Sequence, residues 1–301
     1  MKATGGVWDR KTWPLYFLAT WPDQVEYVDT RTNLLVAVNE LVDPEKRMLL
    51  EEWAEQDRRI FLDSGVYWLA TQHARAHGMS MNEALGIAPD KMDGFEDLFA
   101  AYVEIVKGYE SHLWGYIEID QGGKDNKRRT RRKLEKLGLS PIPVYHPLND
   151  GWDYFDELAS EYDRICLGNV VMASPEQRKR LLATAWERRR KYPNLWIHAL
   201  GLTPNEMSLA YPMNSCDSSA WISNARWGRH KVMTAAQAFG ELVDGFVYSR
   251  DEEDKSERGY LKAWRLAGYD AVMLGRTMGN IKTDVTKELG ADVGLFDQHH
   301  G

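Results

Sequence analysis

The sequence predicts an α/β fold in which eight parallel strands and their helices close into one (β/α)8 barrel, followed by a short C-terminal helical appendage. Three observations predict this class. Eight short β-rich runs alternate with helical stretches along most of the chain. The chain has 301 residues, enough for a barrel of roughly 250. Aspartates directly follow apolar residues at several strand ends, which is where barrel active sites lie.

The strands are expected in runs rich in β-branched, aromatic and aliphatic residues. They occupy residues 16–20, 33–38, 59–65, 114–120, 142–146, 164–170, 195–202 and 214–219. Helices are expected over residues 44–56, 94–108, 124–137, 153–162 and 175–191. Ser174 before Pro175 is typical of a helix N-terminus, and Gly138 of a helix end. A doubly wound open sheet is the alternative architecture for the same alternation.

The alternation does not continue into the last part of the chain. We therefore expect a barrel domain over residues 1–225 and a helical extension over residues 226–301 that packs on the barrel.

Composition limits the partners and the compartment. The formal net charge is −7, which counts mildly against nucleic acid as a partner. Cys166 and Cys216 are the two cysteines, too few for a disulfide framework or a multi-cysteine metal site. With no signal peptide and no apolar run long enough to cross a bilayer, a soluble protein of the cytoplasm is expected. No dinucleotide or nucleotide-triphosphate motif occurs, so neither a cofactor nor a metal is expected.

Asp63, Asp120 and Asp217 each follow apolar residues at an expected strand end. One aspartate in such a place is more typical of a helix cap or a turn. Three on one rim favour chemistry, because two carboxylates beside a glycosidic bond act as nucleophile and general acid. His146 and His198 lie on expected strands without metal-ligand spacing and are interpreted as core or rim histidines.

Several short motifs occur in the order seen in the tRNA-guanine transglycosylase superfamily. They are Asp63-Ser64-Gly65, Pro143-Val144-Tyr145-His146, Leu167-Gly168, His198-Ala199-Leu200-Gly201 and Ser215-Cys216-Asp217-Ser218-Ser219-Ala220-Trp221. Over residues 16–227 the chain most resembles the phage and bacterial branch that inserts 7-deazaguanines into DNA, the DpdA-like proteins.

The resemblance implies a role for each matching residue. Asp217 would attack C1′ of the nucleoside, Asp63 would be the acid/base partner, and Asp120 would bind the base. Ser64 and Gly65 of the Asp-Ser-Gly turn, Gly168 and Gly201 would line the base pocket. Asn169 replaces a second family glycine, which puts that contact in doubt.

The tRNA enzymes of the superfamily carry a three-cysteine, one-histidine zinc site, which two cysteines cannot form. This departure favours the DNA-acting branch. The expected reaction is exchange of guanine in DNA for a free 7-deazaguanine base such as preQ0, through a covalent aspartyl–nucleoside intermediate. The alternatives are the same exchange on tRNA, a retaining glycoside hydrolase, and a non-catalytic nucleic-acid-binding barrel.

A run of basic residues begins just after Asp120. It includes Lys127, Arg128, Arg129, Arg131 and Arg132, and only Asp125 and Glu135 oppose it within the run. A solvated helix face and a phosphate-contacting surface explain the run equally well. We therefore expect these five residues to be candidates for contact with DNA.

Overall fold

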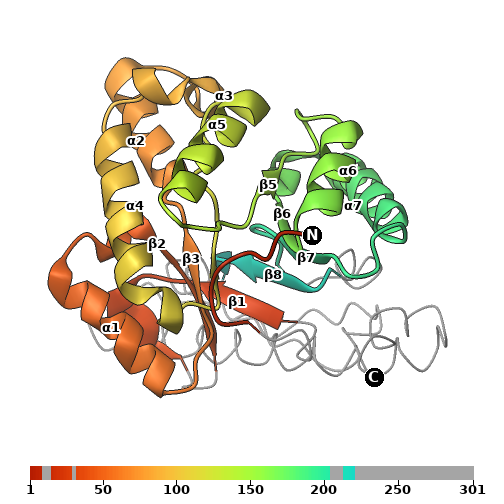
Figure 1. Ribbon diagram of the computed structural model, residues 1–301. Coiled ribbons are helices and arrows are strands. Elements are labelled where there is room, and N and C mark those ends of the chain that lie inside the picture. Colours follow the sequence, from red (N-terminus) through yellow and green to blue (C-terminus); the bar gives the residue numbers. More distant parts are fainter. Residues whose placement is uncertain (9–14, 29–31, 204–212, 221–301) are drawn as a thin grey trace, which may run out of the picture. The chain divides into compact units, whose positions relative to one another are not determined.

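The computed structural model describes residues 1–8, 15–28, 32–203 and 213–220 (Figure 1). The expected extension over residues 226–301 and its boundary with the barrel lie outside the described residues. Among the described residues, no helix is both long and apolar enough to cross a membrane.

All eight expected strands are present. They are β1 (Leu15–Ala19), β2 (Asn33–Ala37), β3 (Ile60–Asp63), β4 (Gly115–Tyr116), β5 (Val144–Tyr145), β6 (Arg164–Leu167), β7 (Trp196–Ala199) and β8 (Ser215–Ser218). They are hydrogen-bonded in the order β4-β3-β2-β1-β8-β7-β6-β5. An isolated parallel bridge pairs Ile117, directly after β4, with Ile142, two residues before β5, so the chain segments at the two ends of this order meet. This cyclic order is that of an α/β barrel-like fold.

The five expected helices are also present. They are α1 (Pro44–Glu55), α4 (Phe95–Tyr109), α5 (Gly123–Lys136), α6 (Trp152–Glu161) and α7 (Pro175–Arg189). Ser174 caps α7 by accepting a hydrogen bond from the Gln177 backbone N–H, as the Ser174-Pro175 pair predicts. Single 3-10 turns fill several connections: η1 (Pro22–Tyr27), η2 (Val38–Leu41), η3 (Pro89–Lys91), η4 (Glu110–His112) and η5 (Val170–Met172).

Two further helices, α2 (Val66–His77) and α3 (Met81–Gly86), were not expected from the sequence. Helix α2 begins and ends at glycines with left-handed backbone, Gly65 and Gly78, so it lacks a polar N-cap side chain. Its buried positions nevertheless follow a helical period: Val66, Leu69, Ala70, His73 and Ala74.

The chain divides into two compact units. Of the described residues, the first unit comprises 1–8 and 35–169, and the second comprises 15–28, 32–34, 170–203 and 213–220. The first unit therefore contains β3 to β6 with helices α1 to α6, and the second contains β1, β7 and β8 with α7.

Arg164 holds the N-terminal residues of the first unit against β4. Its guanidinium is fully buried and donates hydrogen bonds to the Thr4 hydroxyl and to the carbonyls of Gly5 and Trp114. It also lies over the rings of Trp8 and Trp114, at 4.3 and 5.1 Å from their centroids. The buried guanidinium of Arg164 thus fixes the N-terminal residues on the first unit through several hydrogen bonds.

Candidate functional site

Strand alternation gathers four polar side chains on one face of β7 and β8. Residues two apart on a strand share a face, so Trp196 and His198 lie on one face of β7, and Ser215 and Asp217 lie on one face of β8. The parallel register places His198 beside Ser215. All four side chains are buried, and Asp217 is the most exposed of them at 8% of its side chain.

These four residues form a directed chain of hydrogen bonds. The Trp196 indole N–H can only donate, and it lies 2.8 Å from the Ser215 hydroxyl oxygen. The Ser215 hydroxyl is also 2.8 Å from His198 Nδ1, and His198 Nε2 is 3.0 Å from Asp217 Oδ1. We infer that Ser215 donates to Nδ1, which leaves the proton of a neutral imidazole on Nε2, facing the carboxylate.

A second donor reaches the same oxygen of Asp217. The backbone N–H of Gly201 lies 3.0 Å from Oδ1. Gly201 has a φ of 68°, a left-handed conformation that glycine adopts without strain. Within the described residues, both hydrogen bonds to Asp217 therefore fall on Oδ1, and they fix the orientation of the carboxylate.

Cys216 lies between Ser215 and Asp217 but is directed to the opposite face of β8. It is buried and not part of a disulfide. Burial, together with the neighbouring charge of Asp217, raises the pKa of its thiol well above the ordinary value. A neutral buried thiol is a packing group and not a nucleophile, as the sequence predicted.

In the first unit, Asp120 pairs with His146. Asp120 Oδ2 lies 3.0 Å from His146 Nε2, and each side chain is about one-fifth exposed. Burial raises the pKa of the Asp120 carboxyl, but the His146 hydrogen bond and charge more than offset this, so the pKa lies below its ordinary value. Gly168 packs closely on His146, because a Cβ there would meet the imidazole at 2.7 Å.

The remaining expected base-pocket residues also lie in the first unit. Asp63 ends β3 and is half-buried, Ser64 is buried, and Gly65 starts α2 with a φ of 79°. Asn169 has left-handed backbone, with a φ of 51°, and its side-chain amide donates to the Asn149 side-chain oxygen. The structure thus groups Asp120, His146 and Gly168 in one unit, and Asp217, His198 and Gly201 in the other. The pairing of Asp63 with Asp217 stays a prediction.

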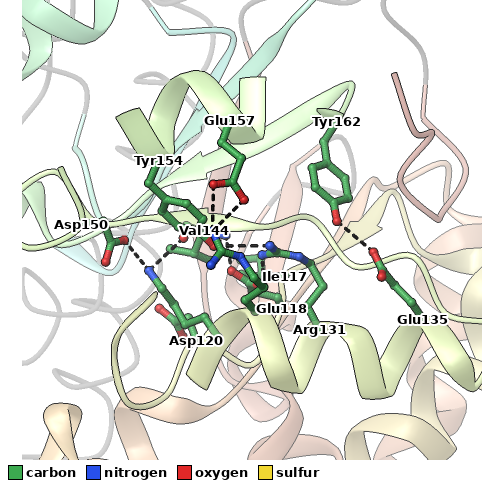
Figure 2. Close-up of polar contacts among 12 residues, drawn as sticks. Ile117, Glu118, Asp120, Arg131, Glu135, Val144, Asp150, Tyr154, Glu157 and Tyr162 are labelled. Carbon is green, nitrogen blue, oxygen red and sulfur yellow. Dashed lines mark hydrogen bonds and ion pairs between the residues drawn. The ribbon is translucent and has the colours of Figure 1, made fainter. Parts of the chain in front are cut away.

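Two members of the basic run on α5, Lys127 and Arg131, are buried and already paired. Figure 2 shows Arg131 among its partners. The Lys127 ammonium is fully buried, 2.6 Å from Asp150 Oδ2 and 3.0 Å from the Val144 carbonyl oxygen. Arg131 is 3% exposed and lies 2.6 Å from Glu118 Oε2. Neither charge reaches solvent, so the burial of Lys127 and Arg131 argues against the expectation that they contact phosphate.

The other three residues that were expected to contact DNA differ in whether their side chains are exposed to solvent. Arg128 forms two hydrogen bonds with Glu157, at 2.7 and 2.8 Å, and lies over the Tyr154 ring. Arg129 and Arg132 are exposed. Only these last two present an exposed side chain that could meet a polyanion.

His146 and His198 are a rim and a core histidine, as the sequence predicted. The sequence did not show that each of them is bonded to one of the strand-end aspartates. The sequence signal for these two pairs was the position of each histidine relative to the strands. Each histidine lies on or just after the strand next to the one that carries its aspartate, so the two side chains meet at the same edge of the sheet.

The chain was compared with known proteins. No family model and no curated protein matches it. Among solved structures it is similar to a tryptophan synthase from M. tuberculosis, with 10% identity, a TM-score of 0.42, and coverage of 88% of this chain and 93% of the other. It is also similar to a dihydrodipicolinate synthase family protein from Coccidioides immitis, with 11% identity, a TM-score of 0.44, and coverage of 97% of this chain and 99% of the other. A fructose-bisphosphate aldolase from Campylobacter jejuni shares 8% identity, with a TM-score of 0.34 and coverage of 89% of this chain and 90% of the other.

These comparisons contradict the resemblance to the tRNA-guanine transglycosylase superfamily. None of the three solved structures is a transglycosylase, and no family model supports the assignment. Motifs of two to seven residues at strand ends are weak grounds for kinship, since unrelated enzymes share the same barrel. The assignment is wrong. At such TM-scores the similarities also carry no information on the substrate or reaction of this chain.

The buried Lys127–Asp150 pair gives a stability prediction. Lys127→Met should lower the free energy of unfolding by about 3–5 kcal/mol, because it leaves the Asp150 carboxylate buried without its cation. Arg132→Met on the exposed face of α5 is the control and should change it by less than about 0.5 kcal/mol. Urea unfolding measures both. Adding Asp150→Asn to Lys127→Met should recover part of the loss, and equal losses in Lys127→Met and Arg132→Met would contradict the pairing.

The Asp120–His146 pair gives a pH prediction. A carboxyl whose folded pKa lies below its unfolded value of about 3.9 stabilises the fold above that pH. The contribution is lost as the pH falls through the folded pKa. The free energy of unfolding should therefore fall more steeply below about pH 4 in the wild-type protein than in Asp120→Asn. Parallel slopes between pH 5 and pH 2 would show that Asp120 is not held in this way.

Proposed function

We propose that the protein is an enzyme that breaks a glycosidic bond, with Asp217 as its nucleophile. The observation that carries the proposal is the carboxylate at the C-terminal end of β8, held on one oxygen by His198 and Gly201. A nucleophilic carboxylate needs one oxygen fixed and the other directed at the carbon it attacks. C-terminal strand ends are also where barrel enzymes place their catalytic groups.

The reaction proceeds in two displacements. Asp217 Oδ2 forms a bond to the anomeric carbon of the sugar, while the bond to the leaving group breaks and its electron pair goes to the leaving atom. A general acid supplies a proton to that atom. An acceptor then attacks the same carbon, gives up a proton, and releases the Asp217 carboxylate, so the configuration of the sugar is retained.

His198 is a positioning residue in this scheme. Its Nε2–H holds Oδ1 of Asp217, and the Trp196–Ser215 pair fixes the imidazole tautomer from behind. The negative charge that returns to the carboxylate when the intermediate breaks down is met by the same two donors. Preorganised donors of this kind lower the barrier because they need no rearrangement during the reaction.

The acceptor decides which reaction of this class the protein performs. Water as acceptor gives a hydrolase. A free purine base gives the exchange of guanine for a 7-deazaguanine expected from the sequence, on DNA or on tRNA, and that reaction stays a prediction. Asp63 as the general acid stays a prediction as well.

The test is turnover by Asp217→Asn. Asparagine keeps an oxygen that accepts from His198 and Gly201, so the fold should be retained while the nucleophile is lost. The probes are p-nitrophenyl glycosides for hydrolysis, and radiolabelled guanine offered with duplex DNA, single-stranded DNA or bulk tRNA for exchange. Activity on the accepted probe should fall by at least about 10³-fold. Thermal unfolding of the variant serves as the control for folding.

Two outcomes would contradict the proposal. One is undiminished turnover by Asp217→Asn. The other is a folded wild-type protein that acts on none of the probes.

The DNA partner is tested separately on α5. Replacing the exposed Arg129 and Arg132 with serine should weaken DNA binding and reduce the slope of log affinity against log salt by about 1.8, the value for two lost phosphate contacts. Arg180→Ser on α7, which removes an exposed arginine of another helix, is the matched control. An unchanged affinity and salt slope would mean that the exposed face of α5 is only solvated.

A further inference from the structure

Two histidines and an aspartate converge on the surface of the first unit. His73 and His77 are four residues apart on α2, so they share one face of the helix. Asp93 directly precedes Gly94, the N-cap residue of α4. One nitrogen or oxygen atom from each of the three side chains lies within 4.8 Å of the others.

The three side chains face one another closely. Asp93 Oδ2 is 2.6 Å from His77 Nε2 and 3.2 Å from His73 Nδ1. The two imidazole rings lie 4.2 Å apart between centroids. The His77 hydrogen bond also holds the pKa of the Asp93 carboxyl below its ordinary value.

The backbone around the cluster is well defined. His77 is followed by Gly78, which ends α2 with left-handed backbone, and Asp93 is followed by Gly94, also left-handed. Gly94 packs on α2, because a Cβ there would lie 3.2 Å from Leu69. The Asp93 N–H donates to His73 Nδ1 at 3.3 Å. That nitrogen therefore carries a lone pair, which imidazole uses to bind a metal, and a metal bound there displaces the long Asp93 N–H hydrogen bond.

We propose that His73, His77 and Asp93 form a binding site for a divalent transition metal, with Zn²⁺ as the favoured ion. Two imidazoles and one carboxylate are a ligand set that Zn²⁺ takes in proteins. Ligand atoms about 2.0–2.1 Å from a tetrahedral Zn²⁺ stand roughly 3.3 Å apart, so the 2.6 Å pair must open slightly. The metal takes the place of the proton shared between His77 and Asp93, and water fills the fourth position.

The cluster can be reached by an ion from solvent. The side chains of His77 and Asp93 are 47% and 69% exposed, while that of His73 is 6% exposed and anchored in the fold. The sequence signal is a pair of histidines at positions i and i+4, His73-Ala-Arg-Ala-His77. It lacks the glutamate of the His-Glu-x-x-His metalloprotease motif, so it indicates binding and does not indicate proteolysis.

The test uses the untagged full chain after removal of metal with a chelator. Zn²⁺ is titrated by calorimetry, and Co²⁺ by its visible absorption. We expect one equivalent of each ion to bind at this site, with a Co²⁺ spectrum typical of nitrogen and oxygen ligands and a Tm that rises with Zn²⁺ concentration. His77→Ala and Asp93→Ala should each lower the affinity at least about 10-fold.

Two controls separate this site from other histidines. His112→Ala removes a histidine of the same unit outside the cluster, and a variant without His299 and His300 removes the pair near the C-terminus. Neither should change the affinity. The exposed positions of His77 and Asp93 make both alanine variants compatible with folding, which thermal unfolding in chelator checks. Absence of binding by the wild-type protein, or equal affinity in His77→Ala and Asp93→Ala, would overturn the proposal.

Discussion

The structure depends on cations and N–H donors that offset the negative charge of carboxylates buried at or after the ends of its parallel strands. An ionised carboxylate taken out of water costs several kcal/mol unless cations or N–H donors surround it. In the first unit, α5 supplies the cations, with Arg131 on Glu118 and Lys127 on Asp150. In the second unit, a histidine and a backbone N–H serve Asp217.

This constraint explains why a helix with so many basic residues does not simply form a polyanion-binding surface. The buried stripe of α5 consists of Lys127, Thr130, Arg131 and Leu134, spaced at helical period. Two of its cations therefore hold the helix to the strand ends. Glu118 Oε1 also accepts the Val144 N–H at 2.6 Å, so the same carboxylate links β4, β5 and α5. Only the opposite side of the helix presents charge to solvent.

The buried carboxylates Glu118 and Asp217 differ in their hydrogen-bond partners, and this difference indicates which of them is structural and which is reactive. Glu118 has partners on both oxygens, a guanidinium on one and a backbone N–H on the other, and such a carboxylate is committed to the fold. Asp217 has the His198 imidazole and the Gly201 backbone N–H, both on Oδ1. These two contacts position the group by one oxygen, and this contrast with Glu118, which is bonded through both oxygens, favours Asp217 as the reactive carboxylate.

The sequence predicted the eight strands and five helices because alternating β-rich and helical patterns depend on local periodicity. It missed α2, since that helix begins at a left-handed glycine without a polar cap, although Val66, Leu69, Ala70, His73 and Ala74 carry a helical period. The sequence also assigned all five basic residues of α5 to one role. The spacing of Lys127 and Arg131 with the buried Leu134 was the signal that separates the buried cations from Arg129 and Arg132. The family resemblance failed because short strand-end motifs describe the barrel more than the reaction.

In the proposed reaction, Asp217 becomes covalently bonded to a sugar. The most direct measurement is mass spectrometry of the protein quenched in acid during turnover of a probe it accepts, followed by peptide mapping. We expect a peptide carrying Asp217 that is heavier by the mass of one glycosyl residue without its leaving group, which for a nucleic-acid probe is the sugar that has lost its base. An adduct on another residue, or retention of configuration with no adduct under conditions that accumulate an intermediate, would contradict it.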